Sequence, residues 1–139
     1  MPTWDGGCGF EHEITNDYHE CSSITKFHTQ AIRALGGIGT HIDAPLHCIP
    51  NGKAIDKLSL ERLIVPGIVI DIASRVHETD SLSCEDVLEF EKLYGIIPAD
   101  SLVLLYTGWD KFWTEPEKYR NNYNFPSISK EAAKLLLKR

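Results

Sequence analysis

Three side chains that can bind a metal or transfer a proton lie close together in the chain: His41, Asp43 and His47. In an extended backbone, side chains at positions i and i+2 point to the same face, so His41 and Asp43 can converge on one ion. An imidazole nitrogen and a carboxylate oxygen suit zinc, manganese or iron(II). Pro45 then restricts the backbone, and His47 can return toward the same pocket.

This combination points to metal-assisted hydrolysis. A bound divalent ion lowers the pKa of a water molecule and polarises the carbonyl group under attack. Asp43 has two oxygens and can bridge two ions, while a histidine titrates near neutral pH, which suits His47 to general acid–base catalysis. The spacing alone fits equally well a loop whose His and Asp side chains contact only water or cap a helix and bind no metal.

Glycines immediately precede these residues. Gly36, Gly37 and Gly39 allow backbone conformations that other residues avoid, and they allow a close approach to a ligand. They end a segment, residues 23–35, whose alternating pattern favours a strand, although a short helix also fits it. Residues 1–22 lack an apolar period and predict a loop-rich arm with at most one short strand.

Regular elements are predicted mainly after residue 57. Residues 58–63 suit a short helical turn, and the apolar runs 67–73 and 102–106 predict buried strands. A helix is predicted over residues 83–94, where Ser83 can cap the first turn and a glycine follows the last.

A last helix is predicted from Ser129 onward, after a loop over residues 121–126. Strands followed by alternating helix and strand favour an α/β or α+β layered architecture. The length of 139 residues suits one domain over residues 1–139 with a modest core.

Composition restricts the partners and the compartment. The formal net charge of −6 argues against non-specific nucleic-acid binding, which needs clustered Lys and Arg. We see no signal peptide and no apolar run of the ~20 residues that a membrane helix needs. The four cysteines form no C-x-x-C pair, so we expect reduced thiols in a cytoplasmic protein that binds neither nucleic acid nor membrane.

The string at residues 39–47, Gly-Thr-His-Ile-Asp-Ala-Pro-Leu-His, resembles the core of the signature of the cyclase/kynurenine-formamidase family, His-x-Gly-Thr-His-x-Asp-x-Pro-x-His. Residues 2–4, 69–72, 104–109 and 125–137 are similar to other parts of that family. The resemblance implies that His41 is a metal ligand, Asp43 is a ligand able to bridge two ions, and His47 transfers protons. It also implies that Trp4 contacts substrate.

The resemblance further implies a fold and an activity. The family's fold is a swivelling β/β/α domain of the α/β class, usually in a homo-oligomer. Its members use a divalent metal ion, Zn²⁺ or Mn²⁺ here, to hydrolyse a C–N amide or lactam bond in small aromatic metabolites such as N-formylkynurenine and isatin. We therefore expect an arylformamidase-like hydrolase with a small-molecule substrate.

Two departures from the family pattern bear on these expectations. The signature's leading histidine falls on Gly37. Either Cys48, His28 or His12 replaces it, or the site holds a single ion with more water. The family's chain also continues past the helix that reaches Arg139 here, with a further His and Glu for the metal site. We therefore expect an incomplete, inactive piece of the domain, with an open sheet edge and uncovered apolar surface that promote association.

Other readings of the same residues remain open. Gly37 supports a non-catalytic relative that acts as a binding or scaffolding module. Cys48 beside His47 allows a cysteine-dependent enzyme, although a buried, inert cysteine is commoner. Trp109 and Trp113 suit the core or an interface somewhat better than an aromatic substrate pocket.

Overall fold

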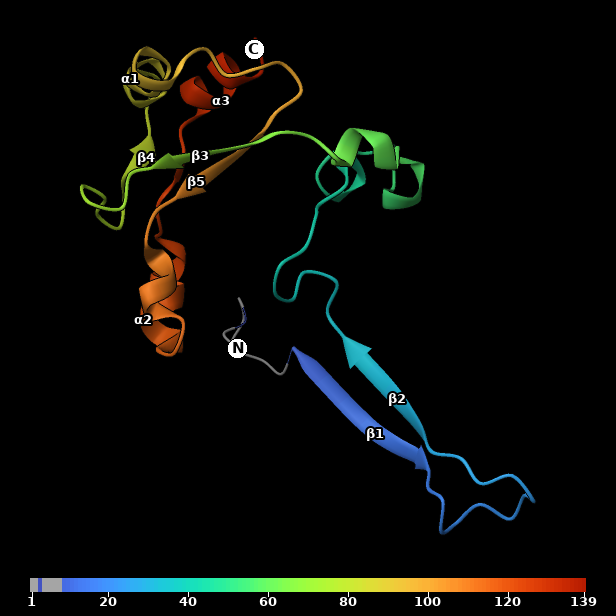
Figure 1. The fold of residues 1–139 in the computed structure, drawn as a ribbon. Coiled ribbons are helices and arrows are strands. Elements are labelled where there is room, and N and C mark those ends of the chain that lie inside the picture. The colour runs from blue at the N-terminus through green and yellow to red at the C-terminus, as the bar shows by residue number, and fades with distance from the viewer. Residues whose placement is uncertain (1–2, 4–8) are drawn as a thin grey trace.

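A computed structural model describes residue 3 and residues 9–139 (Figure 1). Strand β1 (Phe10–Asn16) pairs antiparallel with β2 (Thr29–Ala34), and the register shifts between Ile14 and Asn16. This hairpin extends away from helices α1 (Cys84–Tyr94) and α3 (Lys130–Leu136). The predicted short strand in the first 22 residues and the predicted extended segment before Gly36 are both confirmed.

The connection from the hairpin to the rest of the chain holds three 3₁₀ helices, η1 (Pro45–His47), η2 (Ile55–Lys57) and η3 (Leu60–Leu63). Pro45 suits the first position of η1, where its missing N–H costs no hydrogen bond. Gly52 folds back so closely that a β-carbon there would lie 2.7 Å from the Pro45 carbonyl carbon. The Leu46 amide donates to the Lys53 carbonyl (3.1 Å). These contacts close a compact turn that carries His47.

The second half of the chain forms an α/β layer. Strand β3 (Gly67–Asp71) pairs parallel with β5 (Leu102–Tyr106), and β4 (Ser81–Leu82) pairs parallel with β6 (Ser127–Ile128). Helices α1 and α3 lie together near these strands (Figure 1). The buried core side chains come from both strands and helices: Ile70, Ile72, Leu82, Val87, Ile97 and Ala132.

The two central strands are buried on one face only, which corrects the prediction of fully buried strands. Ile70 is buried, and Leu105 beside it packs against the core. Val69 and its neighbour Leu104 point to the other face and are 54% and 47% exposed. Side chains alternate along a strand, so helices on one side cover every second residue.

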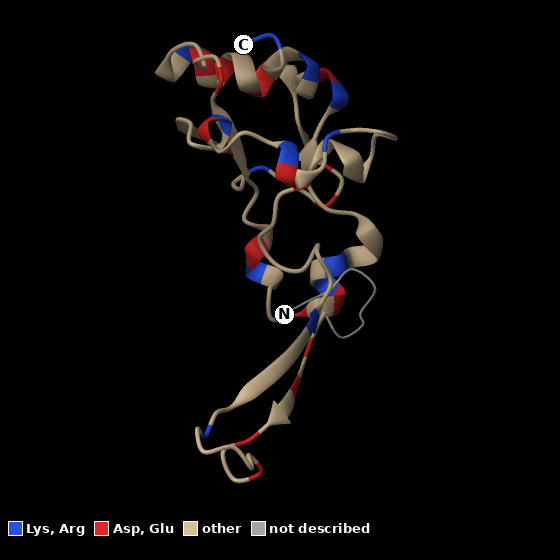
Figure 2. Cartoon of the chain, turned by 90° about the vertical axis from the view of Figure 1, so that its right-hand side faces the viewer, with Lys and Arg blue, Asp and Glu red and all other residues tan. Residues whose placement is uncertain are grey.

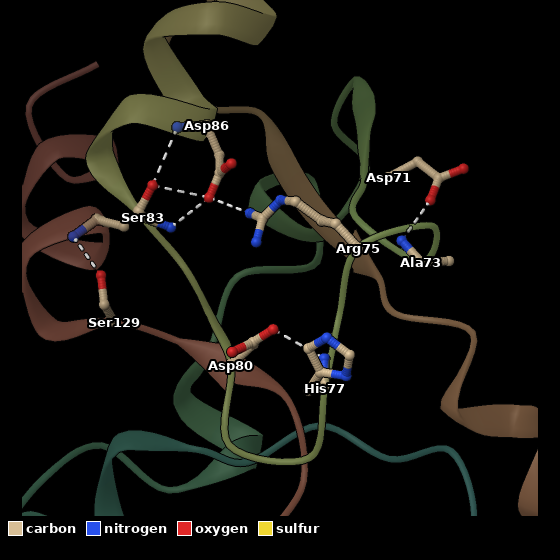
Figure 3. Close-up of polar contacts among 9 residues, drawn as sticks. Asp71, Ala73, Arg75, His77, Asp80, Ser83, Asp86 and Ser129 are labelled. Atoms are coloured by element: carbon tan, nitrogen blue, oxygen red, sulfur yellow. Dashed lines mark hydrogen bonds and ion pairs between the residues drawn. The ribbon is translucent and has the colours of Figure 1, made fainter.

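Helix α1 begins as its sequence predicts (Figure 3). The Ser83 hydroxyl accepts from the Asp86 amide (3.2 Å), and the Asp86 carboxylate accepts from the Ser83 amide (2.7 Å), which completes a capping box. Arg75 forms an ion pair with the same carboxylate. Gly95 ends the helix with φ of +97°, a conformation that favours glycine.

Helix α2 (Pro116–Arg120) follows the 3₁₀ helix η4 (Trp109–Phe112) and precedes η5 (Asn121–Tyr123). The Trp109 indole donates to the Tyr119 carbonyl (2.9 Å), which fixes α2 against η4. Trp109 therefore has the packing role that was predicted for it.

Residues of both charge signs are interspersed along the chain, on the hairpin as well as on the helices (Figure 2). No helix among the described residues has the length and apolar character to cross a membrane.

Candidate metal site and adjoining pocket

His41 is oriented by its own loop. Its Nδ1 lies 2.9 Å from the Gly39 carbonyl oxygen. A carbonyl can only accept, so Nδ1 carries the proton and Nε2 of the neutral ring keeps its lone pair. Gly39 has φ of +69°, a left-handed conformation that favours glycine. This hydrogen bond is the kind that orients metal-binding histidines.

Asp43 shares the space that His41 faces. The His41 Nε2 lies 3.7 Å from Asp43 Oδ1, too far for a hydrogen bond. Zinc lies about 2.0–2.2 Å from nitrogen and oxygen ligands, so one ion can contact both atoms across this gap. The two side chains are 32% and 58% exposed, which leaves the position open to solvent.

His47 borders the same cavity of about 580 Å³ as His41 and Asp43. The other lining residues are small or apolar: Gly36, Gly37, Ala44, Leu46, Ala54 and Ile55. Three of the four residues predicted for the site therefore come together around one cavity. The fourth, Trp4, lies outside the described residues.

Gly37 faces the imidazole of His41. A β-carbon at residue 37 would lie 3.6 Å from His41 Nε2, at van der Waals distance from the ring atom that faces Asp43. The described part of the chain contains no cluster of three or more His, Cys, Asp or Glu that could hold a metal ion. His41 and Asp43 thus fit an ion in donor type and direction, but they form an incomplete ligand set.

None of the three candidate substitutes for the missing ligand borders this cavity within the described chain. His28 lies on the hairpin, where its Nδ1 is 3.3 Å from Asp17 Oδ2 and its Nε2 is 3.1 Å from Gln30 Nε2. His12 is on β1, and Cys48 is an exposed free thiol just past η1.

A second cavity, of about 470 Å³, adjoins the first, and Gly37 and His41 line both. Another wall comes from Trp113, the residue that follows η4, and from Tyr119 and Arg120 of α2. Trp113 thus lines a pocket, the less favoured of its two predicted roles. The sequence did not predict Tyr119 and Arg120 as pocket residues, because no local pattern places α2 beside a loop about eighty residues earlier in the chain.

Comparison with known proteins agrees with this architecture. The family described as "Putative cyclase" matches residues 1–139. The kynurenine formamidase of Bacillus cytotoxicus is 29% identical over 91 residues, which cover 65% of this chain and 40% of that protein. The kynurenine formamidase of Salinibacter ruber is 36% identical over 70 residues, which cover 45% of this chain and 32% of that protein.

Solved structures show the same fold. Isatin hydrolase A from Ralstonia solanacearum superposes with a TM-score of 0.78 at 26% identity, covering 92% of this chain and 52% of that one. Isatin hydrolase A from Labrenzia aggregata, bound to benzyl benzoate, superposes with a TM-score of 0.76 at 28% identity. That match covers 93% of this chain and 53% of the other. The chain therefore has the predicted cyclase-like α/β fold and spans about half the length of these structures.

Proposed function

Because the chain belongs to the cyclase family, we propose that it serves metal-dependent hydrolysis of a C–N amide or lactam bond in a small aromatic molecule. The observation that carries the proposal is the pair of donors, His41 Nε2 and Asp43 Oδ1, 3.7 Å apart at a cavity that His47 also borders. The named hydrolase activities of the relatives support the reaction class.

In this proposal His41 and Asp43 hold one Zn²⁺ or Mn²⁺ ion. When bound, the ion polarises the substrate carbonyl and lowers the pKa of a water molecule. The Gly39 carbonyl holds the His41 ring in the tautomer that presents Nε2. Further ligands come from water or from outside the described residues.

His47 is the proposed proton-transfer residue. Its ring would accept a proton from the attacking water and return it to the departing amine nitrogen. Trp4 is proposed to contact the aromatic part of the substrate. We also propose that residues 1–139 form one domain of a cytoplasmic homo-oligomer.

An assay of formanilide hydrolysis, in which the released aniline is measured, tests the proposal. A longer form of the protein that contains residues 1–139, loaded with Zn²⁺ or Mn²⁺, should hydrolyse formanilide, whereas chelator or Asp43→Ala should abolish the activity. Asp56→Ala is a matched control, because Asp56 is an exposed aspartate paired with Lys57 outside the cavity. Metal-loaded protein without activity would contradict the enzymatic function.

The second candidate is a non-catalytic family member that binds a ligand or a protein. Gly37 and the incomplete ligand set favour it. This candidate predicts that aromatic ligands bind while no formamide, lactam or lactone is hydrolysed under any metal condition.

A further inference from the structure

We propose that Arg120 binds a carboxylate and makes the pocket beside His41 selective for aromatic anions. The inference rests on the proposed function only in treating the bound anion as a substrate. The binding itself follows from the lining of the pocket and can be measured without a metal.

The pocket leads directly to the candidate metal site. Gly37 and His41 line both the 470 Å³ pocket and the neighbouring cavity. A molecule in the pocket would therefore place one end against the His41 ring. Its other end would reach the wall formed by Trp113 and by Tyr119 and Arg120 of α2.

That wall suits an aromatic ring. Trp113 and Tyr119 meet edge to face, with their ring centroids 5.6 Å apart and an interplanar angle of 89°. Leu35 and Ile38 add apolar surface on the loop side. A cavity of about 470 Å³ lies within the usual range for small-ligand pockets, and aromatic walls favour ring-shaped ligands.

The charge of the pocket selects an anion. The Arg120 side chain is only 19% exposed, and no acidic side chain lines this pocket within the described chain. A guanidinium in partly desolvated surroundings attracts a carboxylate more strongly than one in water. Its planar donor pairs also match the two oxygens of a carboxylate.

Arg120 keeps donors for such a ligand. Its Nη1 donates to the Thr3 carbonyl (3.3 Å), and its Nη2 pairs with Glu117. The guanidinium has five N–H donors, and within the described residues these two contacts leave the others available. The Glu117 side chain is almost fully exposed, so this pair is weak and a ligand can compete with it.

The test is calorimetric titration of the full 139-residue chain with benzoate and with benzamide, in the presence of a chelator. Benzamide has the same ring and shape but no charge. We expect benzoate to bind about tenfold more tightly or better, because its hydrogen bonds to arginine are charge-assisted. Arg120→Gln should abolish the preference, Arg120→Lys should retain part of it, and Glu117→Gln should increase benzoate affinity.

Arg33→Gln is the matched control, because Arg33 is an exposed arginine on β2 outside this pocket. Circular dichroism checks that each variant is folded. Equal affinity of the wild type for the two ligands, no binding of either, or an unchanged preference in Arg120→Gln would overturn the proposal. Because no metal is present, these outcomes are independent of whether formanilide is hydrolysed.

Discussion

At the scale of single residues, the structure explains how a short string of sequence becomes a possible ligand pair. The Gly39 carbonyl fixes the His41 ring, and Asp43 follows two residues later on the same side. The i, i+2 spacing predicted this arrangement because it depends only on local backbone geometry. The position of His47 depends on the turn that Gly52 closes, which spacing alone does not specify.

Gly37→His should raise the affinity for Zn²⁺ by about tenfold or more, because a third ligand would complete the pair. A β-carbon at this position would face His41 Nε2 at 3.6 Å, and Gly37 is not in the left-handed region. Isothermal titration with Zn²⁺ measures the change. Gly37→Phe supplies similar bulk without a nitrogen, and equal affinities in the two variants would contradict the prediction.

His47→Gln should lower kcat for formanilide by about 10²–10⁴-fold, the usual contribution of general acid–base catalysis. Metal content should stay unchanged, because His47 is proposed to move protons and not to hold the ion. Kinetics and elemental analysis of the same sample separate the two roles. Loss of metal together with activity would make His47 a ligand instead.

At the scale of elements, helix α1 was the most predictable feature of the chain. Ser83, the acidic first turn and Gly95 are local signals, and each lies where it was predicted. The positions of strands β3 and β5 were predicted correctly, but the burial of their side chains was not. Burial depends on which face of the sheet a distant helix covers. Val69 and Ile70 are adjacent in sequence and opposite in exposure for this reason.

Ser83→Ala should lower the free energy of unfolding by about 1 kcal/mol, since it removes the N-cap acceptor of α1. Urea denaturation followed by circular dichroism measures this loss. The exposed Ser23 provides a control, and Ser23→Ala should change stability by less than about 0.5 kcal/mol. Equal effects of the two substitutions would show that the cap does not stabilise the helix.

The capping box should also make stability depend on pH. Burial raises the pKa of Asp86, but hydrogen bonds from Ser83 and the Arg75 guanidinium outweigh burial and hold the pKa below its usual value of 3.8. The folded state therefore gains stability above the unfolded pKa and loses it as pH falls through the folded pKa. Asp86→Asn should cost about 1–3 kcal/mol at pH 6.

Denaturation at pH 6 and at pH 3 checks the sign. The difference between wild type and Asp86→Asn should shrink at pH 3, because Asp86 is then largely protonated in the unfolded state and the stabilisation linked to its ionisation falls. A difference that stays constant between the two pH values would assign the effect to shape and not to ionisation.

At the scale of the whole molecule, the pocket was the part that sequence could not predict. Arg120 and Tyr119 reach the loop of His41 only because α2 packs against η4 and turns toward the N-terminal half. Such a contact between distant segments has no periodic signal. The family resemblance predicted the fold, but it did not point to Arg120.

The uncovered face of β3 and β5 should make the chain self-associate. Val69 and Leu104 are adjacent across this sheet and about half exposed, and apolar surface of this kind favours contact with another protein. Sedimentation at increasing concentration should show larger species. Val69→Lys with Leu104→Lys should reduce them, and unchanged association would place the contact elsewhere.

The most direct test of the metal site is the metal content of the purified protein, measured by elemental analysis. Wild type, Asp43→Ala and the control Asp56→Ala are each incubated with Zn²⁺ or Mn²⁺, and free ion is then removed. We expect bound metal in wild type and in Asp56→Ala, and its loss in Asp43→Ala. Equal metal content in all three proteins, or none in any, would contradict a site built on His41 and Asp43.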